Sequence, residues 1–281
     1  MDVRAILNLA PPAHAFTVDL EEWFHGIELP ESSWPSESRL RVGLDRLLGL
    51  LDRHDTKATF FVLGAVAERF PALVAELAAD GHEIGCHGHA HRFVYKQTPD
   101  EFRTDLRRAR DSVGSAAGAQ PAGYRAPYFS IRTDSLWALE ILAEEGFTYD
   151  SSIFPVRNYR YGIPDAPREP HDVATATGRL REIPLTPARI MGQNLPFSGG
   201  AYLRILPWWA QRLTWSAADR GNRNVMAYIH PWELDPEHPV IALPRRVAAT
   251  HYARLRLTER RLDRLLERYR FGRLNEVFAV A

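Results

Sequence analysis

The stretch that decides how this chain folds is Glu83-Ile84-Gly85-Cys86-His87-Gly88-His89-Ala90-His91-Arg92-Phe93. Residues 77–85 have the pattern of a helix that runs into a short buried strand. His87 and His91 stand four residues apart, so a helical turn after Cys86 would place both imidazoles on one face, within reach of one divalent cation. Two histidines do not complete a coordination shell, and the acidic cluster Asp19-Leu20-Glu21-Glu22, at the end of an early strand, is the expected source of a carboxylate. This pairing predicts a metal-dependent hydrolase.

The composition agrees with a soluble enzyme. The chain has 281 residues, enough to bury a large core as one α/β barrel or as a barrel with an appendage. Its 35 basic and 35 acidic residues cancel, so nothing predicts nucleic acid or an anionic membrane as a partner. No segment is long and apolar enough to span a bilayer, and the first residues are a poor signal peptide, so we expect a cytoplasmic location. The single cysteine, Cys86, excludes an intrachain disulfide and is expected to be a buried filler.

Expected strands alternate with expected helices along most of the chain. The strands are predicted at residues 15–20, 58–63, 122–125, 147–150, 180–185 and 224–229, and the helices at 38–54, 64–79 with a break at Pro71, 99–115, 133–145, 206–220 and 257–269. Repeated β-then-α units favour parallel strands joined by right-handed crossovers. Residues 154–200 break the pattern and read as proline-rich and irregular. We expect one domain over residues 1–281, with a core at about 15–235 and a C-terminal extension at 236–281 packed on it.

Polar residues stand at the C-terminal ends of the expected strands. They are Asp19, His87, Arg125, Asp150 and His230. In a barrel of parallel strands these ends converge on one mouth, where barrel enzymes carry out their chemistry. Stability alone does not account for such a set, so the sequence predicts an active site there.

Five short motifs in this order resemble those of the polysaccharide deacetylase family, also called the NodB-homology or carbohydrate esterase family 4 group. They are Thr17-Val18-Asp19-Leu20-Glu21-Glu22, His87-Gly88-His89-Ala90-His91, Arg125-Ala126-Pro127-Tyr128, Asp150-Ser151-Ser152 and Ile229-His230-Pro231. The likeness covers residues 15–235 and is closest to the branch associated with exopolysaccharide and exosortase loci, which carries a His-Pro-Trp-Glu segment and a C-terminal extension. It implies an α/β fold, a distorted, incomplete (β/α) barrel of NodB type, with a C-terminal helical extension.

The resemblance also implies one bound divalent metal ion, with His87 and His91 as nitrogen ligands. Zn²⁺ is the expected ion, and Co²⁺, Ni²⁺ and Fe²⁺ also suit a site of nitrogen and oxygen ligands. The commonest form of the first motif has two adjacent aspartates, the second of which binds the metal, whereas Asp19 is followed here by Leu20, Glu21 and Glu22. In an extended strand Asp19 and Glu21 point to the same face and Glu22 points away. We therefore expect Glu21 as the carboxylate ligand, with Glu22 as the alternative.

The catalytic roles follow from the same resemblance. Asp19 resembles the family's base, which takes the proton of the attacking water, and Arg125 would orient it and keep it ionised. His230 would protonate the departing amine, with Asp150 hydrogen-bonded behind it. The alternative for Asp150 is a turn cap with the two serines that follow it. The backbone N–H near Tyr128 is expected to complete an oxyanion site.

Substrate contacts are expected from Tyr128, Trp23, His25 and Trp232. Trp232 stands next to His230 and could stack on a sugar ring, whereas His25 could equally be a loop residue that faces solvent. The arginine-rich helix at 257–269 is expected to pack on the barrel, with a dimer contact as its alternative.

Three functions are compatible with these residues. The leading one is a de-N-acetylase that acts on an N-acetylated glycan or sugar precursor in exopolysaccharide biosynthesis. The second is a hydrolase of another small amide or ureide, which the intact His87/His91 pair disfavours. The third is a non-catalytic sugar-binding protein of a polymer-synthesis complex, which needs neither a base nor an acid.

Overall fold

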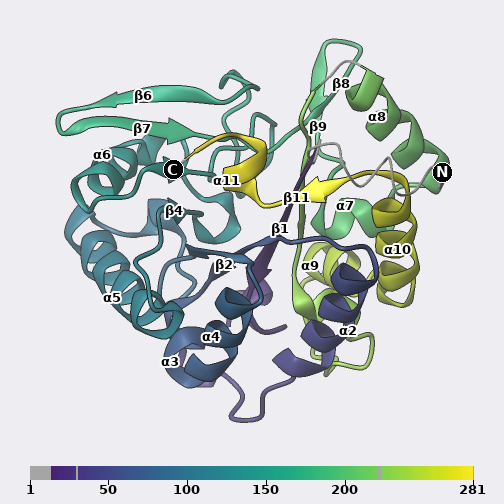
Figure 1. The fold of residues 1–281 in the computed structure, drawn as a ribbon, viewed down its shortest axis with the longest axis horizontal. Coiled ribbons are helices and arrows are strands. Elements are labelled where there is room, and N and C mark those ends of the chain that lie inside the picture. The colour runs from purple at the N-terminus through teal and green to yellow at the C-terminus, as the bar shows by residue number, and fades with distance from the viewer. Residues whose placement is uncertain (1–13, 30, 221–222, 281) are drawn as a thin grey trace.

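One large, mostly parallel sheet organises the protein, and the computed structural model describes it over residues 14–29, 31–220 and 223–280 (Figure 1). The strand order is β10-β1-β2-β3-β4-β5-β7-β6, with β11 paired to β1. The strands are β1 (His14–Leu20), β2 (Thr59–Val62), β3 (Glu83–Cys86), β4 (Gly123–Tyr124), β5 (Tyr149–Asp150), β6 (His171–Thr175), β7 (Gly178–Glu182), β10 (Met226–Ile229) and β11 (Phe271–Gly272). Only β6, antiparallel to β7, runs against the others. A separate hairpin joins β8 (Ala188–Ile190) to β9 (Gln193–Leu195).

The helices surround the strands in Figure 1. They are α2 (Leu40–Arg53), α3 (Gly64–Arg69), α4 (Pro71–Ala79), α5 (Pro99–Ala117), α6 (Trp137–Glu144), α7 (Gly200–Ile205), α8 (Trp208–Arg220), α9 (Arg245–His251), α10 (Thr258–Arg268) and α11 (Leu274–Val277). No helix among the described residues is long and apolar enough to cross a bilayer.

Strand β1 separates the hydrophobic core from the polar interior because alternate residues point to opposite faces of a sheet. Phe16, Val18 and Leu20 are fully buried in the main hydrophobic cluster, together with residues of helices α2, α3, α4, α8 and α10. Thr17 and Asp19 point to the other face, where Thr17 donates to the carbonyl of Ala227 on β10. The strand thereby directs its acidic end toward the inside of the barrel while its apolar residues hold the helices.

The alternating β/α pattern predicted from the sequence is confirmed. The break at Pro71 is present, since α3 ends at Arg69 and α4 begins at Pro71. Helix α5 begins with Pro99 after a Thr98–Glu101 capping box, as the N-terminal proline suggested. The prediction for residues 154–200 was incomplete, because this stretch holds β6, β8 and β9 in addition to the expected strand. Their short, largely exposed strands bury little apolar surface and give a weak sequence pattern.

The α/β class with a parallel sheet is confirmed, and the strand pairings describe an open path rather than a closed ring among the described residues. The C-terminal extension contributes to the sheet, since β11 pairs with the start of β1 at His14 and Ala15. The backbone N–H of Leu274 also donates to Thr59 Oγ1 at 2.7 Å. That all 281 residues form one domain stays a prediction.

Helix α2 sets the position of the segment after β10, because the two pack without room for a side chain between them. A Cβ atom added at Gly43 would lie 1.9 Å from the carbonyl oxygen of Pro231. We predict that Gly43→Ala lowers the free energy of unfolding by about 1–3 kcal/mol, since helix and loop must move apart. In the same helix, a Cβ at Gly49 meets nothing closer than 3.8 Å, so Gly49→Ala should raise stability by about 0.5–1 kcal/mol.

Urea unfolding of the two variants beside the wild type measures both effects. Equal stabilities for Gly43→Ala and Gly49→Ala would contradict the close contact between α2 and the loop at Pro231.

Candidate active site

Three side chains from two strand ends converge on one point. Glu21 follows β1, and His87 and His91 follow β3. Each offers a ligand atom, and these atoms all lie within 4.8 Å of one another in a buried position. One carboxylate and two imidazoles match the set that holds Zn²⁺ in catalytic sites, which leave a further position open for water or substrate.

The loop between His87 and His91 is not the helical turn expected from the four-residue spacing. Gly88 and His91 have positive φ angles of 73° and 52°, so the segment is a bent loop and not a helix. Asp105 of α5 holds this loop by accepting hydrogen bonds from the backbone N–H groups of His89 (2.8 Å) and Ala90 (3.3 Å). The left-handed backbone at a non-glycine residue marks His91 as a position whose geometry is imposed by its surroundings.

His87 is oriented for metal binding through its other ring nitrogen. Its Nδ1 lies 2.8 Å from the backbone carbonyl of Arg125, which can only accept, so Nδ1 carries the proton and Nε2 keeps its lone pair. Burial lowers the pKa of His87 to about 4, so the ring is neutral near pH 7. A neutral, fixed imidazole is the form that binds a metal ion.

Glu21 is held at both of its oxygens. Trp232 Nε1 donates to Oε1 at 3.1 Å, and Oε2 lies 2.5 Å from His91 Nε2. Burial alone would raise the pKa of Glu21, but the neighbouring charges of His91 and His230 outweigh burial and hold the pKa far below its usual value. Oε2 is buried, and its near polar neighbour is the candidate ligand atom Nε2 of His91, so the two ligand atoms face the same point. The residues therefore fit a divalent cation.

Glu22, the alternative ligand, points away from this site. It accepts hydrogen bonds from Ser38 Oγ and from the backbone N–H of Arg39 at 3.3 Å, at the start of α2. Its carboxylate thus stabilises the N-terminus of a helix, as acidic groups commonly do. Side chains alternate between the two faces along β1, and this alternation continues through the two residues after the strand. Glu21 and Glu22 therefore point in opposite directions.

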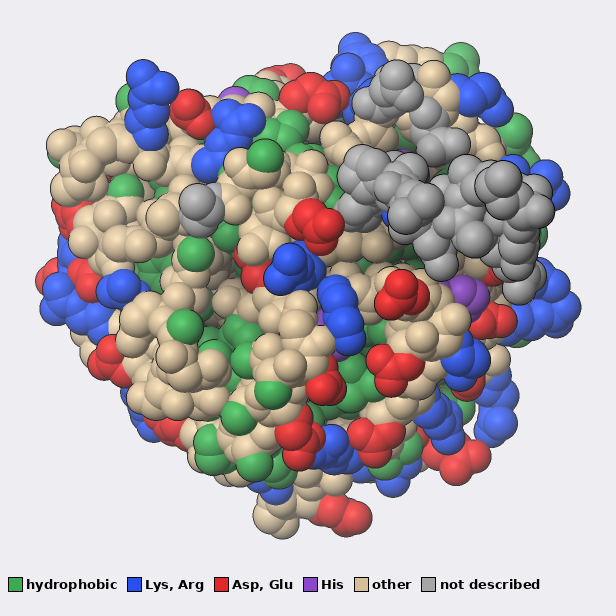
Figure 2. All heavy atoms as spheres, in the orientation of Figure 1, with side chains coloured by type: hydrophobic (Ala, Val, Ile, Leu, Met, Phe, Trp, Pro, Cys, Tyr) green, Lys and Arg blue, Asp and Glu red, His purple; other side chains and the backbone are tan. Residues whose placement is uncertain are grey.

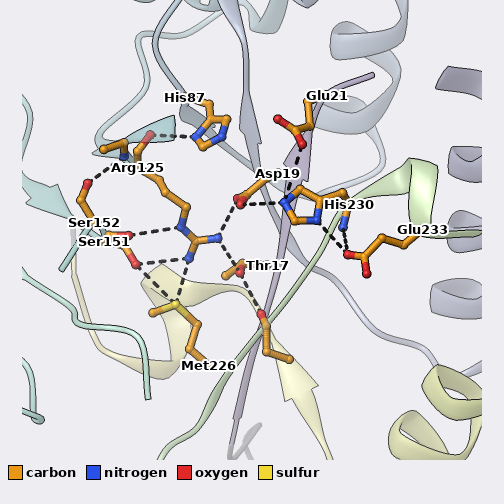
Figure 3. Close-up of polar contacts among 12 residues, drawn as sticks. Thr17, Asp19, Glu21, His87, Arg125, Ser151, Ser152, Met226, His230 and Glu233 are labelled. Carbon is orange, nitrogen blue, oxygen red and sulfur yellow. Dashed lines mark hydrogen bonds and ion pairs between the residues drawn. The ribbon is translucent and has the colours of Figure 1, made fainter. Parts of the chain in front are cut away.

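Asp19 is paired with a fully buried arginine (Figure 3). Arg125 Nη1 donates to Asp19 Oδ1 and to Thr17 Oγ1, both at 2.8 Å, while its Nε donates to the carbonyl of Ser151 at 3.2 Å. The guanidinium also lies 4.1 Å from the centre of the Phe61 ring. These contacts leave the guanidinium no freedom to rotate, so they fix the position of the Asp19 carboxylate.

His230 faces both carboxylates. Its Nε2 lies 3.7 Å from Asp19 Oδ2 and 3.7 Å from Glu21 Oε1. Burial alone would lower the pKa of His230, but the charges of Glu21, Glu233 and Asp19 outweigh burial and raise the pKa to about 9.

The residue behind His230 is Glu233, and the expected contact with Asp150 is wrong. Glu233 Oε1 lies 2.8 Å from His230 Nδ1 and accepts the backbone N–H of His230 at 3.1 Å (Figure 3). Arg204 of α7 donates to the other carboxylate oxygen at 2.5 Å, and both Glu233 and Arg204 are almost fully buried. The short helical turn after His230 returns the chain on itself, so that a residue three positions on reaches the imidazole.

Asp150 instead forms the turn with the serines that follow it. Its carboxylate accepts from Ser152 Oγ at 2.6 Å and from the backbone N–H of Ser152 at 3.2 Å. It stands opposite Glu182 in the β5–β7 pairing, and both carboxyl groups are buried. Burial and the charge of Asp150 raise the pKa of Glu182 far above its usual value, so this pair keeps a proton at neutral pH.

The proton that Asp150 and Glu182 share should make the free energy of unfolding depend on pH. The unfolded chain releases this proton above about pH 4.5 and the folded chain keeps it, so stability decreases as pH rises through this range. Glu182→Gln can keep a hydrogen bond to Asp150 without titrating. We predict that the loss of unfolding free energy between pH 5 and pH 8 is smaller in Glu182→Gln than in the wild type, as measured by urea unfolding at each pH. An equal pH dependence in both proteins would contradict the protonated pair.

The candidate site residues open onto a cavity of about 200 Å³. Asp19, Glu21, His87, His91 and His230 all line it. Tyr128 lines it too, with a positive φ of 56° in the turn after Arg125. The predicted site residues line this cavity, with the exceptions of Arg125, Asp150, Trp23 and His25. Arg125 is fully buried and reaches the site through its ion pair with Asp19.

Trp23 and His25 lie outside the residues that line this cavity, contrary to expectation. Trp23 is buried and stacks on His238, with ring centres 5.5 Å apart. His25 lines a neighbouring pocket, where its ring lies 4.4 Å from that of Trp34. Trp23 therefore packs against the C-terminal extension, whereas His25 lies behind the site, with its ring stacked 5.7 Å from that of His91.

Other residues of the site gave little or no sequence signal. Glu233 could have been found from its spacing to His230 within the His-Pro-Trp-Glu segment, because a short turn brings positions three apart together. Tyr159 and Arg204 also line the cavity. Tyr159 comes from residues 154–200, which lacked a clear pattern, and Arg204 lies between that stretch and the helix expected at 206–220.

Comparisons with known proteins agree with the resemblance seen in the motifs. Residues 40–149 match the family model described as polysaccharide deacetylase, and residues 151–279 match a domain of unknown function, DUF3473. A peptidoglycan-N-acetylglucosamine deacetylase of Bacillus cereus is 38% identical over 96 residues, which is 34% of this chain and 35% of that protein. The chain spans about a third of the length of the curated relatives it matches.

Solved structures extend the likeness to nearly the whole chain. A peptidoglycan N-acetylglucosamine deacetylase aligns with a TM-score of 0.52 at 20% identity, over 96% of this chain and 90% of that one. An allantoinase aligns with a TM-score of 0.58 at 17% identity, over 99% and 96%. At these identities the structures show the fold alone. Residues 40–149 thus resemble a polysaccharide deacetylase domain, and a place in the exosortase-locus branch stays a prediction.

Proposed function

We propose that this protein is a metal-dependent hydrolase that removes N-acetyl groups from an amino-sugar-containing glycan. One observation carries the proposal: a carboxylate fixed by a buried arginine, Asp19, and a histidine backed by a carboxylate, His230, face the Glu21-His87-His91 cluster across one cavity. Hydrolysis of an amide needs a base, an acid and an electrophile, and these residues can supply or hold all three. The names of the relatives support an N-acetylglucosamine substrate.

Glu21, His87 and His91 would hold the ion, with Zn²⁺ as the proposed metal. A divalent ion in that position supplies an activated water molecule and polarises the acetyl carbonyl. The protein contributes the orientation of its ligands: His87 is fixed by the Arg125 carbonyl, and Glu21 is fixed by Trp232 Nε1.

Proton transfer is assigned to two residues. Asp19 can accept the proton of the attacking water, because Arg125 occupies only one of its oxygens within hydrogen-bond distance and Oδ2 faces the cavity. His230 Nε2 can donate a proton to the amine nitrogen as the C–N bond breaks, since Nδ1 is engaged by Glu233. The products are acetate and a free amino sugar, with one water consumed.

Two other functions remain less well supported. The fold alone also fits an amide or ureide hydrolase, since an allantoinase has the same architecture. The family-model match over residues 40–149, which includes both histidines and Arg125, favours a deacetylase. A purely sugar-binding protein would not need the buried Arg125–Asp19 pair and the Glu233–His230 pair to point into one cavity.

If Asp19 is the base and not a metal ligand, replacing it should lower the activity without lowering the metal content. Asp19→Asn keeps the shape and a hydrogen-bond acceptor for Arg125 but removes the base. We expect acetate release from N-acetylglucosamine oligomers to fall about 10²- to 10⁴-fold, with metal content unchanged. Asp45→Asn, which alters an exposed acid on α2, is the matched control. Loss of metal in Asp19→Asn would assign Asp19 to the ligand set instead.

The role of Glu233 predicts which carboxylate supports His230. Glu233→Gln keeps the size of the side chain but removes the charge that orients the imidazole, so kcat should fall roughly 10- to 100-fold. Asp150→Asn should reduce kcat far less, since Asp150 contacts Ser152 and Glu182 rather than His230. Steady-state kinetics on both variants shows which carboxylate supports His230. A larger decrease in kcat for Asp150→Asn than for Glu233→Gln would assign that role to Asp150.

The biological setting stays a prediction. We propose exopolysaccharide biosynthesis and a cytoplasmic location on the sequence resemblance alone, and a dimer contact through the C-terminal extension as a further expectation.

A further inference from the structure

Helix α8 buries one face and exposes two large apolar side chains on the other. Trp215 and Gln211 are fully buried, and Gln211 Nε2 donates to the carbonyl of Phe197 at 3.0 Å, so these residues hold the helix to the core. Trp209 is 67% exposed and Leu213 is 60% exposed, one turn apart on the outer face. Core packing therefore does not account for Trp209 and Leu213, and large apolar side chains that are grouped on a surface commonly mark an interaction site.

Arginines surround these two side chains. Two neighbouring hollows of the surface lie between α8 and α10, and Arg212 and Arg268 line both of them. Arg264 and Glu267 also line the first hollow, and Arg220 lines the second together with Trp209 and Leu213. We call this surface the α8–α10 face, which consists of Trp209, Leu213, Arg212, Arg220, Arg264 and Arg268.

The four arginines of the α8–α10 face have no ion-pair partner among the described carboxylates, and Glu267 is the one acid among the described residues of the two hollows. On α5, by contrast, Arg107 pairs with Glu145 at 2.8 Å and Arg108 pairs with Glu68 at 3.0 Å. Figure 2 shows Lys and Arg side chains along the right-hand edge of the molecule, where Figure 1 places α8 and α10. The formal net charge of zero is thus unevenly distributed, and this face is positive.

We propose that the α8–α10 face docks the protein on an anionic phospholipid bilayer. The inference goes beyond the proposed function and does not depend on it. Trp209 and Leu213 enter the zone between the headgroups and the acyl chains, where tryptophan side chains are favoured. The long arginine side chains reach the lipid phosphates while their methylene groups lie along the apolar surface. A net charge of zero does not oppose this docking, because the attraction acts over a Debye length of about 10 Å and depends on the local charge.

Other occupants fit the α8–α10 face less well. In a twofold contact between copies of the chain the same patch meets itself, so the four arginines of one copy would face those of the other. Nucleic acid offers phosphates, but its backbone gives Trp209 and Leu213 no apolar layer to enter. A bilayer surface supplies both the negative charge and the apolar layer.

Co-sedimentation with vesicles tests the proposal. The protein is mixed with vesicles of phosphatidylcholine alone or of equal parts phosphatidylcholine and phosphatidylglycerol. We expect binding to the anionic vesicles that weakens as salt is raised from about 0.1 M to about 1 M. Trp209→Ala/Leu213→Ala should lower the partition coefficient about tenfold or more, since less apolar surface enters the bilayer. Arg264→Gln/Arg268→Gln should lower it about 20- to 30-fold.

Two control variants match these changes. Arg107→Gln/Arg108→Gln removes the same number of charges from α5, on the other side of the molecule in Figure 1, and Val240→Ala shortens an exposed apolar side chain outside the α8–α10 face. Both should bind the anionic vesicles as the wild type does.

Three results would overturn the proposal. The first is a wild type that does not bind the anionic vesicles, or face variants that bind them as tightly as the wild type. The second is a dimer, seen by sedimentation velocity, that Trp209→Ala/Leu213→Ala dissociates without a change in vesicle binding, which would assign the face to a second copy. The third is binding to duplex DNA in place of vesicles, lost in Arg264→Gln/Arg268→Gln, which would assign the face to nucleic acid.

Discussion

The buried guanidinium of Arg125 is the constraint on which the site depends. Its side chain fixes Asp19, and its backbone carbonyl fixes the proton on His87, so one residue orients both the proposed base and a proposed metal ligand. The charge of a fully buried arginine must be compensated, because an unpaired charge in the interior costs several kcal/mol. Asp19 supplies that compensation, which ties the folding of the barrel interior to the geometry of the active site.

A second buried ion pair gives the C-terminal half a part in the same site. Arg204 pairs with Glu233 behind His230, and its Nη2 donates to the carbonyl of Thr250 at the end of α9 at 3.0 Å. The orientation of His230 is therefore linked to residues 151–279, which match a domain of unknown function. This half also carries Tyr159 and Trp232, which line the same cavity as His230 and Glu233.

The fold and the core of the site could be predicted from the sequence because they depend on local patterns. Apolar runs predicted the strands, and apolar residues at helical spacing predicted the helices. Polar residues at the ends of parallel strands predicted that Asp19, His87 and His230 lie together. The backbone of His91 could not be predicted, because a left-handed residue held by Asp105 leaves no periodic signal. Partners such as Arg204 come from distant segments, and the sequence contains no local indication of which charges meet in the interior.

The proposed function depends on Glu21, His87 and His91 holding one divalent metal ion. Elemental analysis of the purified protein after dialysis against Zn²⁺, beside a His87→Ala/His91→Ala double variant, tests it most directly, with His171→Ala as a control for a histidine outside the site. We expect about one equivalent of metal in the wild type and in His171→Ala, and its loss in the double variant. Equally low metal content in all three proteins would show that these residues do not form a metal site.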